Sequence, residues 1–507
     1  MKEKIVSIER VSKISSQQKQ KGKTIVLCHG VFDLLHIGHI KHFQEAKTLG
    51  DLLIVTVTPD EYVNKGPNRP AFTTRLRLDA IAALQSVDYV VENKWPNAVN
   101  TISMIKPDIY FKGPDYKDNE SDLTGMIKEE AKAVKSVKGK IFYSSDITFS
   151  SSKLLNKYAD IYTDDQKVFI SSIENQLQEE SLNETFKKLK NLKVLLIGET
   201  IIDQYVFCEA LGKSGKEPVL AFRDLGSEQY LGGAPAVANH LSNFCKKITL
   251  LTALGEKKEY EGFIRNNLSK NVRTKFIYKS NSPTIVKKRF VDNITKNKTL
   301  GVYSINDESL ISSDEKKFSN IVLNEIKKHD MILIADYGHG LISKSLAVKL
   351  SRFSPYTALN VQMNAANSGS HSFSKYKKAD CVIINEGELR HELRSREGNL
   401  ENLMKLLSKN LKSKNIVVTR GKAGVTLYNT KKKKFFSCPA FASKVVDKIG
   451  SGDAMLALLS ISLRGGYDEK FSLFLGSLAA AQSVESIGNS QPINLKKMKK
   501  TIQHAIK

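Results

Sequence analysis

The chain has 507 residues, of which 41% are hydrophobic and 26% are charged, a composition that excludes global disorder and a length that predicts more than one domain. Its 78 lysine and arginine residues outnumber its 53 acidic residues and give a formal net charge of +25. Nucleic-acid-binding proteins share such an excess, but these lysines are spread along the whole chain and no nucleic-acid module surrounds them. We therefore expect an enzyme with anionic substrates and no nucleic-acid partner, and nucleic-acid binding is the less favoured alternative.

Cysteine spacing and hydropathy indicate the compartment. The five cysteines, Cys28, Cys208, Cys245, Cys381 and Cys438, lie far apart and form no C-x-x-C pair, so neither a disulfide framework nor a structural zinc site is expected. The first residues are charged, and no run of about 18 apolar residues occurs. We expect a cytoplasmic protein without a membrane partner.

The first part of the chain alternates segments typical of strands and helices. A polar segment, 1–21, comes first and is interpreted as an N-terminal extension that forms a short helix. Strands are predicted at 24–28, 52–58, 89–91 and 109–111, and helices at 37–49, 74–85 and 98–105. This alternation predicts an α/β domain over 22–158, with a Rossmann-like parallel sheet covered by helices on both faces.

A different pattern follows over 159–191, which we interpret as a helical linker. Its apolar residues fall on one helical stripe: Val168, Ile173, Leu177, Leu182 and Phe186. The stripe predicts an amphipathic helix that either packs on its own domains or takes part in dimerisation.

Strand and helix alternate again over 192–507, which predicts a second, larger α/β domain. Strands are predicted at 193–198, 248–251, 331–335, 381–384, 416–419 and 424–428, and helices at 454–464 and 471–484. The lysine run 431–434 is expected at the tip of a hairpin.

The first chemical motif follows strand 24–28 and begins a helix. It reads Gly30-Val-Phe-Asp-Leu-Leu-His36-Ile-Gly38-His39. Two histidines at this spacing turn their rings and the helix N–H groups towards one point, which favours a triphosphate, and the glycine lets phosphate approach the backbone. A protonated imidazole there stabilises charge that develops on leaving pyrophosphate. A zinc pair is disfavoured because no third ligand is near in sequence.

Together with Lys47, Arg69-Pro70, Arg77 and a serine run, the motif resembles the cytidylyltransferase-like nucleotidyltransferases over 22–158. The resemblance implies that His36, His39 and Lys47 are catalytic and contact the phosphates. It implies that a further set binds the nucleotide: Gly30, Phe32, Asp33, Arg77, Ser150, Ser151 and Ser152.

One later segment narrows this resemblance. Lys112-Gly-Pro-Asp-Tyr116 is similar to a stretch of the heptose-1-phosphate nucleotidyltransferase branch, with proline in place of the second glycine. Class I aminoacyl-tRNA synthetases also carry H-I-G-H, but this domain is too short for them and has no tRNA-binding appendage.

The second chemical motif is Asp447-Lys-Ile-Gly-Ser-Gly-Asp-Ala454, directly before a predicted helix. Small residues at a helix start leave N–H groups free to bind a γ-phosphate, and the helix dipole favours the anion. A carboxylate at this point can accept the proton of an attacking hydroxyl. A glycine- and serine-rich loop with an N-capping aspartate is the alternative interpretation.

Four further segments favour the functional interpretation, and their order is that of the ribokinase-like (PfkB) carbohydrate kinases, which the chain resembles over 192–505. The segments are 198–203, 232–239, 385–388 and 419–424. Lys448 and Ser451 replace the threonine and alanine of the family's motif. The resemblance implies Asp453 as catalytic base, with Gly450, Ser451 and Gly452 as an anion hole for ATP. The other implied contacts are Asp203, Gly232, Gly233 and Asn239 to the sugar, Thr419, Gly421 and Gly424 to the nucleotide, and Asn385 and Glu388 to a metal ion.

Two segments, 215–219 and 336–340, are most similar to heptose 7-phosphate kinases. In contrast, Leu359-Asn-Val-Gln-Met-Asn364 and the polar run through His371 stand where that branch has an I-D-P-K strand end. The difference motivates an alternative in which the nucleotidyltransferase is active and the second domain is a sugar-binding or regulatory module. The intact Asp453 motif favours an active kinase.

The two resemblances combine into one hypothesis. A kinase that phosphorylates an anomeric hydroxyl with ATP makes a sugar 1-phosphate, and a nucleotidyltransferase joins this product to a nucleotide from ATP or CTP and releases pyrophosphate. The arrangement resembles the bifunctional heptose enzymes of lipopolysaccharide synthesis with the domain order reversed. It implies Mg²⁺ as cofactor, K⁺ as an additional cation, a sugar or sugar phosphate as substrate, and a homodimer. A polyol or amino-alcohol phosphate is the alternative substrate.

Overall fold

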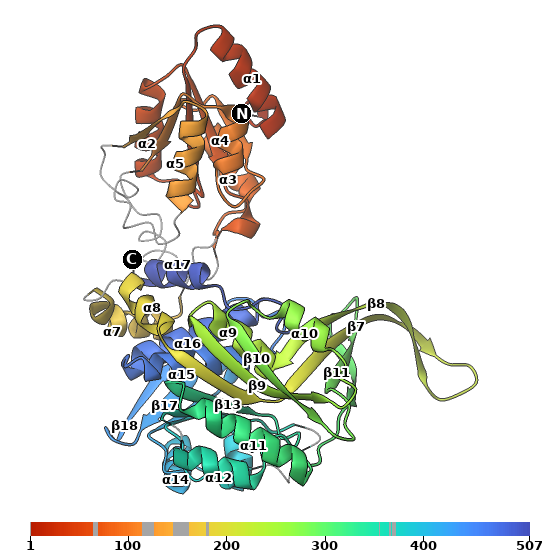
Figure 1. Ribbon diagram of the computed structural model, residues 1–507. Helices are drawn as coiled ribbons and strands as arrows, with labels where there is room; N and C mark the ends of the chain where they lie inside the picture. Colours follow the sequence, from red (N-terminus) through yellow and green to blue (C-terminus); the bar gives the residue numbers. More distant parts are fainter. Residues whose placement is uncertain are drawn as a thin grey trace. The chain divides into compact units, whose positions relative to one another are not determined.

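The computed structural model describes residues 2–63, 69–113, 126–144, 162–178, 182–353, 355–364, 367 and 372–506. The chain divides into two compact units, and each is an α/β structure, as predicted (Figure 1). Unit 1 comprises residues 1–171 and 496–507, and unit 2 comprises residues 172–495.

Unit 1 is built on a five-stranded parallel sheet in the order β3-β2-β1-β4-β5. Its strands are β1 (Ile25–Gly30), β2 (Leu52–Val57), β3 (Tyr89–Glu92), β4 (Ile109–Lys112) and β5 (Lys140–Tyr143). Its helices are η1 (Lys2–Lys4), α1 (Ile8–Gln20), α2 (Ile37–Thr48), η2 (Asp60–Tyr62), α3 (Thr74–Ala82), α4 (Val99–Ile105) and α5 (Met126–Ser136). The central strand β1 is apolar and buried on both faces, as a parallel strand between two helical layers requires.

The two faces of this sheet have separate cores. Side chains of α2 and α3, such as Phe43 and Leu78, pack on one face, and those of α1, α4 and α5, such as Val11, Ile102 and Val134, pack on the other. The N-terminal extension is therefore a helix that belongs to the core of unit 1.

The segment interpreted as a linker contains α7 (Asp164–Gln178) and α8 (Leu182–Lys190). Ile173 and Phe186 are buried, but Val168 is 72% exposed, so the predicted apolar stripe is wrong at Val168.

Unit 2 has a nine-stranded sheet in the order β10-β9-β6-β13-β14-β15-β16-β17-β18 and a four-stranded sheet in the order β12-β11-β7-β8. The strands of the large sheet are β6 (Lys193–Gly198), β9 (Lys247–Gly255), β10 (Val272–Lys279), β13 (Met331–Asp336), β14 (Thr357–Val361), β15 (Cys381–Asn385), β16 (Asn415–Thr419), β17 (Val425–Asn429) and β18 (Lys434–Cys438). The small sheet contains β7 (Thr200–Lys213), β8 (Leu220–Gly233), β11 (Val286–Asp292) and β12 (Lys298–Ser304). The lysine run lies at the turn between β17 and β18, as predicted.

Helices cover both faces of the large sheet (Figure 1). They are α9 (Ala234–Ser242), α10 (Glu261–Asn267), α11 (Ser312–Ile326), α12 (Lys344–Phe353), η4 (Phe373–Lys375), α13 (Glu386–Glu392), α14 (Leu400–Asn410), η5 (Gly421–Ala423), α15 (Ser451–Arg464) and α16 (Glu469–Ser483). The last helix, α17 (Leu495–Ile506), belongs to unit 1 except for its first residue. The hairpin of β7 and β8 extends away from the rest of unit 2 (Figure 1).

The five cysteines are free and buried. Within the described ranges, no helix is long and apolar enough to cross a membrane.

Candidate active sites

The first candidate site lies where β1 leads into α2. Gly30 ends β1, and a Cβ at this position would lie 2.9 Å from the ring of Phe32, so any other residue here would push that ring aside. His36 is the N-cap of α2, and its Nδ1 accepts a hydrogen bond of 3.1 Å from the N–H of Gly38. The rings of His36 and His39 stack with centroids 3.9 Å apart. The structure therefore brings the two predicted histidines together at the start of a helix.

This hydrogen bond determines the tautomer of His36. Because Nδ1 accepts, the neutral ring carries its proton on Nε2, which is then a donor. Phe32 packs edge-on against His39 at 5.3 Å and orients its ring. A helix N-terminus with two imidazoles is a suitable site for the phosphates of a nucleotide.

Arg77, which was predicted to contact the nucleotide, is engaged by protein groups. A guanidinium has five N–H groups, and in Arg77 all five donate within the protein. The acceptors are Phe72 O, Val31 O, Thr58 O, Asp60 Oδ1 and Thr74 Oγ1, at 2.5–3.1 Å. Arg77 therefore fixes the loop that carries the histidines and has no donor left for a phosphate.

Asp33 is also occupied by protein groups. Its side chain is buried, pairs with Arg69 at 3.0 Å and accepts N–H bonds from Ala71 (2.6 Å) and Phe72 (3.3 Å). It ties the loop after β1 to the segment before α3, which is a positioning role in place of the predicted nucleotide contact.

Lys47 is not brought to the histidines. It lies eleven residues after His36, at the other end of α2, which corresponds to about 16 Å along the helix. Its ammonium pairs with Asp88 and donates to Asp51 O, each at 2.6 Å. We therefore propose no catalytic role for Lys47. The predicted contacts of Ser150, Ser151 and Ser152 lie outside the described residues.

A buried polar cluster near His29 and His42 was not predicted as part of the site. Lys112, at the end of β4, pairs with Glu130 at 2.8 Å, and Tyr110 donates to the same carboxylate at 2.9 Å. Burial lowers the pKa of His29 and of His42 to about 4, so both rings are neutral near pH 7. The position of Lys112 at the end of a strand could have marked it as a candidate site residue. That it lies near β1 follows only from the sheet order, in which β1 and β4 are neighbours.

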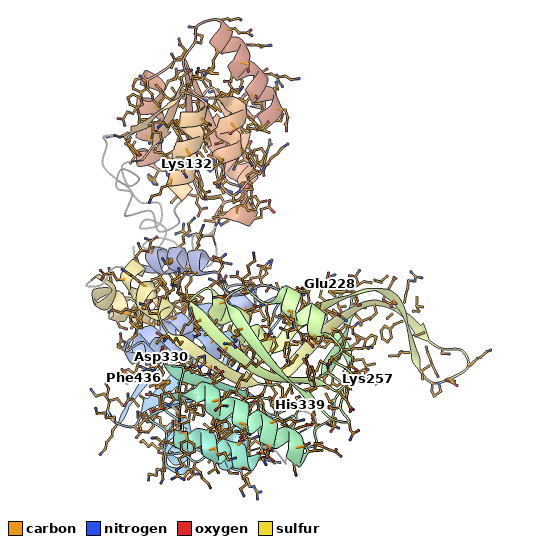
Figure 2. All side chains as sticks on the ribbon, in the orientation of Figure 1. Lys132, Glu228, Lys257, Asp330, His339 and Phe436 are labelled. Carbon is orange, nitrogen blue, oxygen red and sulfur yellow. The ribbon has the colours of Figure 1, made fainter. Side chains whose placement is uncertain are left out.

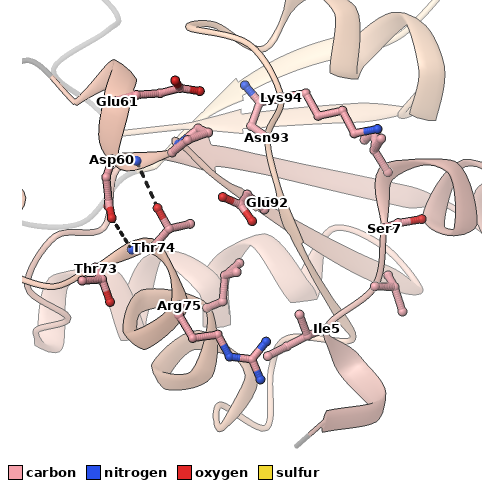
Figure 3. Close-up of a pocket in the computed structure, with 14 residues that line it drawn as sticks. Ile5, Ser7, Asp60, Glu61, Thr73, Thr74, Arg75, Glu92, Asn93 and Lys94 are labelled. Carbon is pink, nitrogen blue, oxygen red and sulfur yellow. Dashed lines mark hydrogen bonds between the residues drawn. The ribbon is translucent and has the colours of Figure 1, made fainter. Parts of the chain in front are cut away.

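Unit 1 also contains a pocket of about 820 Å³ (Figure 3). It is lined by residues 5–8, 59–61, 73–75 and 92–94, together with Leu78. Asp60 and Thr74 join two of these segments by reciprocal hydrogen bonds of 3.0 Å, drawn as dashed lines in Figure 3. None of the predicted nucleotide contacts of the described chain lines it, so the pocket is distinct from the turn that carries His36 and His39.

The second candidate site is at the start of α15. Gly450, the N-cap, has a left-handed backbone (φ +89°) and no side-chain cap. The N–H of Ser451 donates to Lys448 O at 3.5 Å, and the N–H groups that follow it in the first turn are left for a ligand. Asp453 lies in the first turn, where Tyr337 donates to its Oδ1 at 2.7 Å and Asn489 donates to its Oδ2 at 3.4 Å. Burial raises the pKa of Asp453 to about 6, and the charge of Asp203 adds to the shift.

The predicted sugar contacts are only partly brought together. Asp203 on β7 is buried, and a Cβ at Gly232 would collide with its carboxylate, so Gly232 and Asp203 are neighbours. Gly233, with φ +60°, is the N-cap of α9. Asn239 instead lies in the last turn of α9. Its amide donates to Asn267 O at 2.9 Å and accepts from the N–H of Ser269 at 3.0 Å, so it holds a loop and its predicted sugar contact is not supported.

Two cations on β11 were missed by the sequence interpretation. Lys287 and Arg289 lie two residues apart and therefore on the same face of the strand, and the parallel register pairs Lys287 with Asp203. Arg289 forms an ion pair with Asp203, while no carboxylate of the described chain lies within ion-pairing distance of Lys287. Burial lowers the pKa of Lys287. We call Asp203, Lys287 and Arg289 the Asp203 cluster, and its net charge is positive.

Asn385 and Glu388 lie together, but as a capping box at the start of α13. Asn385 Oδ1 accepts from the N–H of Glu388 at 2.8 Å, and the two oxygens of Glu388 accept from the N–H groups of Asn385 and Met363, each at 3.1 Å. Burial raises the pKa of Glu388. The described residues contain no group of three metal-ligating side chains, yet Mg²⁺ bound to ATP often needs only one or two protein carboxylates, so Glu388 fits a Mg²⁺–ATP complex.

The residues predicted to contact the nucleotide of ATP, Thr419, Gly421 and Gly424, lie next to the capping box of Asn385 and Glu388. Thr419 ends β16 and is paired in register with Asn385 at the end of β15. Gly421 and Gly424 have φ of +55° and +83°, and a Cβ at Gly424 would collide with Cys438 O, so this tight turn requires glycine.

The segment that departs from the heptose kinases supports the site. Met363 donates its N–H to Glu388, as above, and the side chains of Asn364 and Asn367 donate to Tyr337 O at 2.8 and 2.9 Å. Tyr337 in turn holds Asp453. The polar run therefore fixes two residues of the candidate kinase site.

Comparison with known proteins identifies the families of the two domains. The model of the pfkB family carbohydrate kinases matches residues 191–496, more than half of the chain. The chain belongs to the pfkB family. A cytidylyltransferase-like family model matches residues 27–174, so the domain that precedes the pfkB domain is cytidylyltransferase-like. Ribokinase from Giardia lamblia covers 62% of this chain and 99% of its own with a TM-score of 0.50 at 15% identity, which shows the fold alone.

Curated relatives match one domain at a time. The bifunctional protein HldE of Sulfurimonas denitrificans is 40% identical over 138 residues, 27% of this chain and 29% of that protein. The bifunctional protein HldE of Koribacter versatilis is 27% identical over 301 residues, 59% of this chain and 60% of that protein. The alignments have the lengths of the cytidylyltransferase-like and pfkB domains, as a reversed domain order requires. The chain thus spans less than two thirds of the length of each of these relatives.

Proposed function

We propose that this pfkB-family chain makes an activated sugar in two steps. Unit 2 transfers the γ-phosphate of ATP to the anomeric hydroxyl of a sugar phosphate, with a heptose 7-phosphate as the first candidate. Unit 1 joins the resulting anomeric phosphate to the nucleotidyl group of ATP or CTP and releases pyrophosphate. The observation that carries the proposal is the position of Asp453. It is buried in the first turn of α15, a helix whose N-terminus has no side-chain cap, and it is close enough to Asp203 for the two charges to interact.

In the kinase step, Asp453 accepts the proton of the sugar hydroxyl as its oxygen attacks the γ-phosphate. A pKa of about 6 keeps most of this carboxylate ionised at pH 7 while leaving it a better proton acceptor than an exposed aspartate. Tyr337 and Asn489 orient it, and the N–H groups at the start of α15 stabilise the transferred phosphoryl group. Mg²⁺ delivered with ATP supplies charge neutralisation, and Glu388 would hold it.

The charge of the Asp203 cluster supports a phosphorylated sugar as the substrate. Asp203 can accept hydrogen bonds from sugar hydroxyls, while Arg289 neutralises it and Lys287 adds a buried positive charge. A buried cation without a carboxylate partner is costly unless an anion joins it, and a sugar phosphate provides one.

In the nucleotidyltransferase step, the anomeric phosphate attacks the α-phosphate of the nucleotide. His36, through Nε2–H, and His39 stabilise the charge on the attacked phosphate and on the leaving pyrophosphate. Arg77 and Asp33 hold the loop rigid, so the histidines need little reorganisation.

A homodimer and a cytoplasmic location belong to the same proposal. The four-stranded sheet exposes apolar side chains, among them Leu220, Leu225, Leu300 and Val302, which a second copy of the chain could cover. All five cysteines are free, which suits a reducing compartment.

The test is ATP turnover against a panel of sugars and sugar phosphates that includes heptose 7-phosphate, with Asp453→Asn as the matched variant. Phosphorylation of one sugar phosphate that falls about 10²–10⁴-fold in the variant is expected. If no sugar is phosphorylated but a ready-made sugar 1-phosphate yields pyrophosphate, unit 2 is a sugar-binding or regulatory module and the kinase half of the proposal is wrong.

A further inference from the structure

His339, which Figure 2 labels, was given no role by the sequence interpretation. It forms a dyad with Asp307. It lies in the loop after β13, two residues beyond Tyr337, the residue that holds Asp453. Its side chain is completely buried, and Nδ1 lies 2.5 Å from Asp307 Oδ1. Across the described part of the chain, its Nε2 has no hydrogen-bond partner although it is buried.

The charge state of the ring follows from its surroundings. Burial lowers the pKa of His339, and the positive charges of Lys287 and Lys279 act in the same direction, while Asp307 opposes them. The ring is therefore neutral near pH 7. A neutral ring next to a carboxylate donates from Nδ1, so Nε2 carries the lone pair and is a hydrogen-bond acceptor.

The backbone holds this acceptor in one place. The N–H of His339 donates to Glu199 at 3.1 Å, and Lys279 donates to its carbonyl at 3.1 Å. The next residue, Gly340, has φ +85°, and a Cβ there would collide with the Glu308 carbonyl. Every polar atom of His339 except Nε2 is thus engaged. A buried hydrogen-bond acceptor without a donor lowers the stability of the folded protein, and because Nε2 is held in place it needs a ligand or a water molecule to donate to it.

The neighbours of the dyad indicate which ligand this is. Lys287 lies within the field of both Asp307 and Asp203, so the dyad borders the Asp203 cluster. A phosphate oxygen offers no proton to Nε2, whereas a sugar hydroxyl does. We propose that Nε2 of His339 accepts a hydrogen bond from one hydroxyl of the sugar phosphate and so selects among sugars by the presence of that hydroxyl. This inference rests on the proposed kinase function.

The experiment measures kcat/KM for the preferred sugar phosphate and for its singly deoxygenated analogues, in wild type and in His339→Phe, after thermal unfolding has established that the variant folds. For wild type, kcat/KM should be about tenfold to a hundredfold lower with the analogue that lacks the recognised hydroxyl than with the complete sugar phosphate. We call the loss of kcat/KM on removal of one hydroxyl its deoxy penalty. In His339→Phe the deoxy penalty at the recognised hydroxyl should disappear, while the deoxy penalties at the other positions remain. If all penalties persist unchanged in the variant, Nε2 holds only water and the proposal is overturned.

His329→Phe is the matched control, because this buried histidine of unit 2 has partners on both ring nitrogens, Glu325 O and Thr249 Oγ1, each at 2.8 Å. It should lower the unfolding temperature and leave every deoxy penalty unchanged. His339→Leu replaces His339→Phe if the latter does not fold.

Failure of the kinase function is distinguishable from failure of this inference. If wild type phosphorylates nothing, the same pairs of sugar phosphates are compared by calorimetric titration. One deoxy penalty in Kd that His339→Phe abolishes would uphold the role of His339 without catalysis, and absence of any binding would overturn both proposals.

Discussion

The helices α2 and α15 both begin at a candidate phosphate site, but their first turns are built differently. α2 begins at His36, whose side chain already accepts one of the helix N–H groups, and it presents imidazole rings. α15 begins at Gly450 without a side-chain cap and presents its own N–H groups, with Asp453 beside them. The difference matches the two proposed reactions, because phosphate attack requires only charge stabilisation, whereas attack by a hydroxyl also requires a proton acceptor.

The largest effect that separates the two sites is expected from His39→Ala. Loss of the stacked ring should lower the rate of pyrophosphate release from a sugar 1-phosphate and ATP or CTP by about 10²–10³-fold, because a stabilising donor is removed from the transition state. ADP release by unit 2 of the same protein is the internal control. An equal fall in both rates would mean that the substitution disturbs more than the α2 site.

Gly450→Ala tests the open helix start. The substitution forces alanine into φ +89°, and its Cβ would collide with Asn489, which donates to Asp453. The strain is worth about 1–3 kcal/mol, so we expect kcat of the kinase to fall about tenfold or more. Gly262→Ala, where an added Cβ meets no atom within 4 Å, is the control and should keep full activity. Full activity of Gly450→Ala would show that this conformation is not needed.

A smaller effect is expected from pH. Asp453 accepts a proton only when ionised, and its pKa is raised to about 6, so the kinase rate is full above this pH and falls as the pH drops through it. At pH 5 about a tenth of the carboxylate remains ionised, and kcat/KM should fall about tenfold. The measurement is ADP release between pH 5 and 8. A rate that stays constant to pH 5 would contradict the role of Asp453 as base.

Lys47→Ala should have the smallest effect. Its ammonium is about one third exposed and pairs with Asp88 at the far end of α2, where such pairs contribute about 0–1 kcal/mol to stability. We expect pyrophosphate release within about twofold of wild type and a slightly lower unfolding temperature. A large loss of rate with unchanged stability would restore the catalytic role that the sequence predicted.

Both motifs could be predicted from the sequence because each lies in one short segment at the junction of a buried strand and a helix. The roles of Arg77 and Lys47 could not, because residue type shows that a side chain can donate but not whether its donors are already used. Lys287 was missed for a different reason. It faces Asp203 only through the parallel register of β11 with β7, two strands far apart in the chain.

The small sheet of unit 2 was harder to predict than the large one. All seven residues of β12 are exposed, and β8 is exposed over much of its length, so neither carries the apolar run by which β6 and β13 are predicted. β12 forms by pairing with β11 and β8 forms by pairing with β7, and neither strand depends on burying an apolar face. The periodicity of apolar residues in the sequence therefore does not predict these exposed strands.

The central claim is that one chain carries two separable activities in series, and a crossed assay of two variants tests it most directly. Wild type, Asp453→Asn and His39→Ala are each incubated with ATP, CTP and the preferred sugar phosphate, and the products are separated by mass. The account predicts a nucleotide sugar from wild type, accumulation of the anomeric phosphate with His39→Ala, and no product with Asp453→Asn until the anomeric phosphate of the same sugar phosphate is added ready-made. Failure of this added intermediate to restore nucleotide sugar in Asp453→Asn would contradict it.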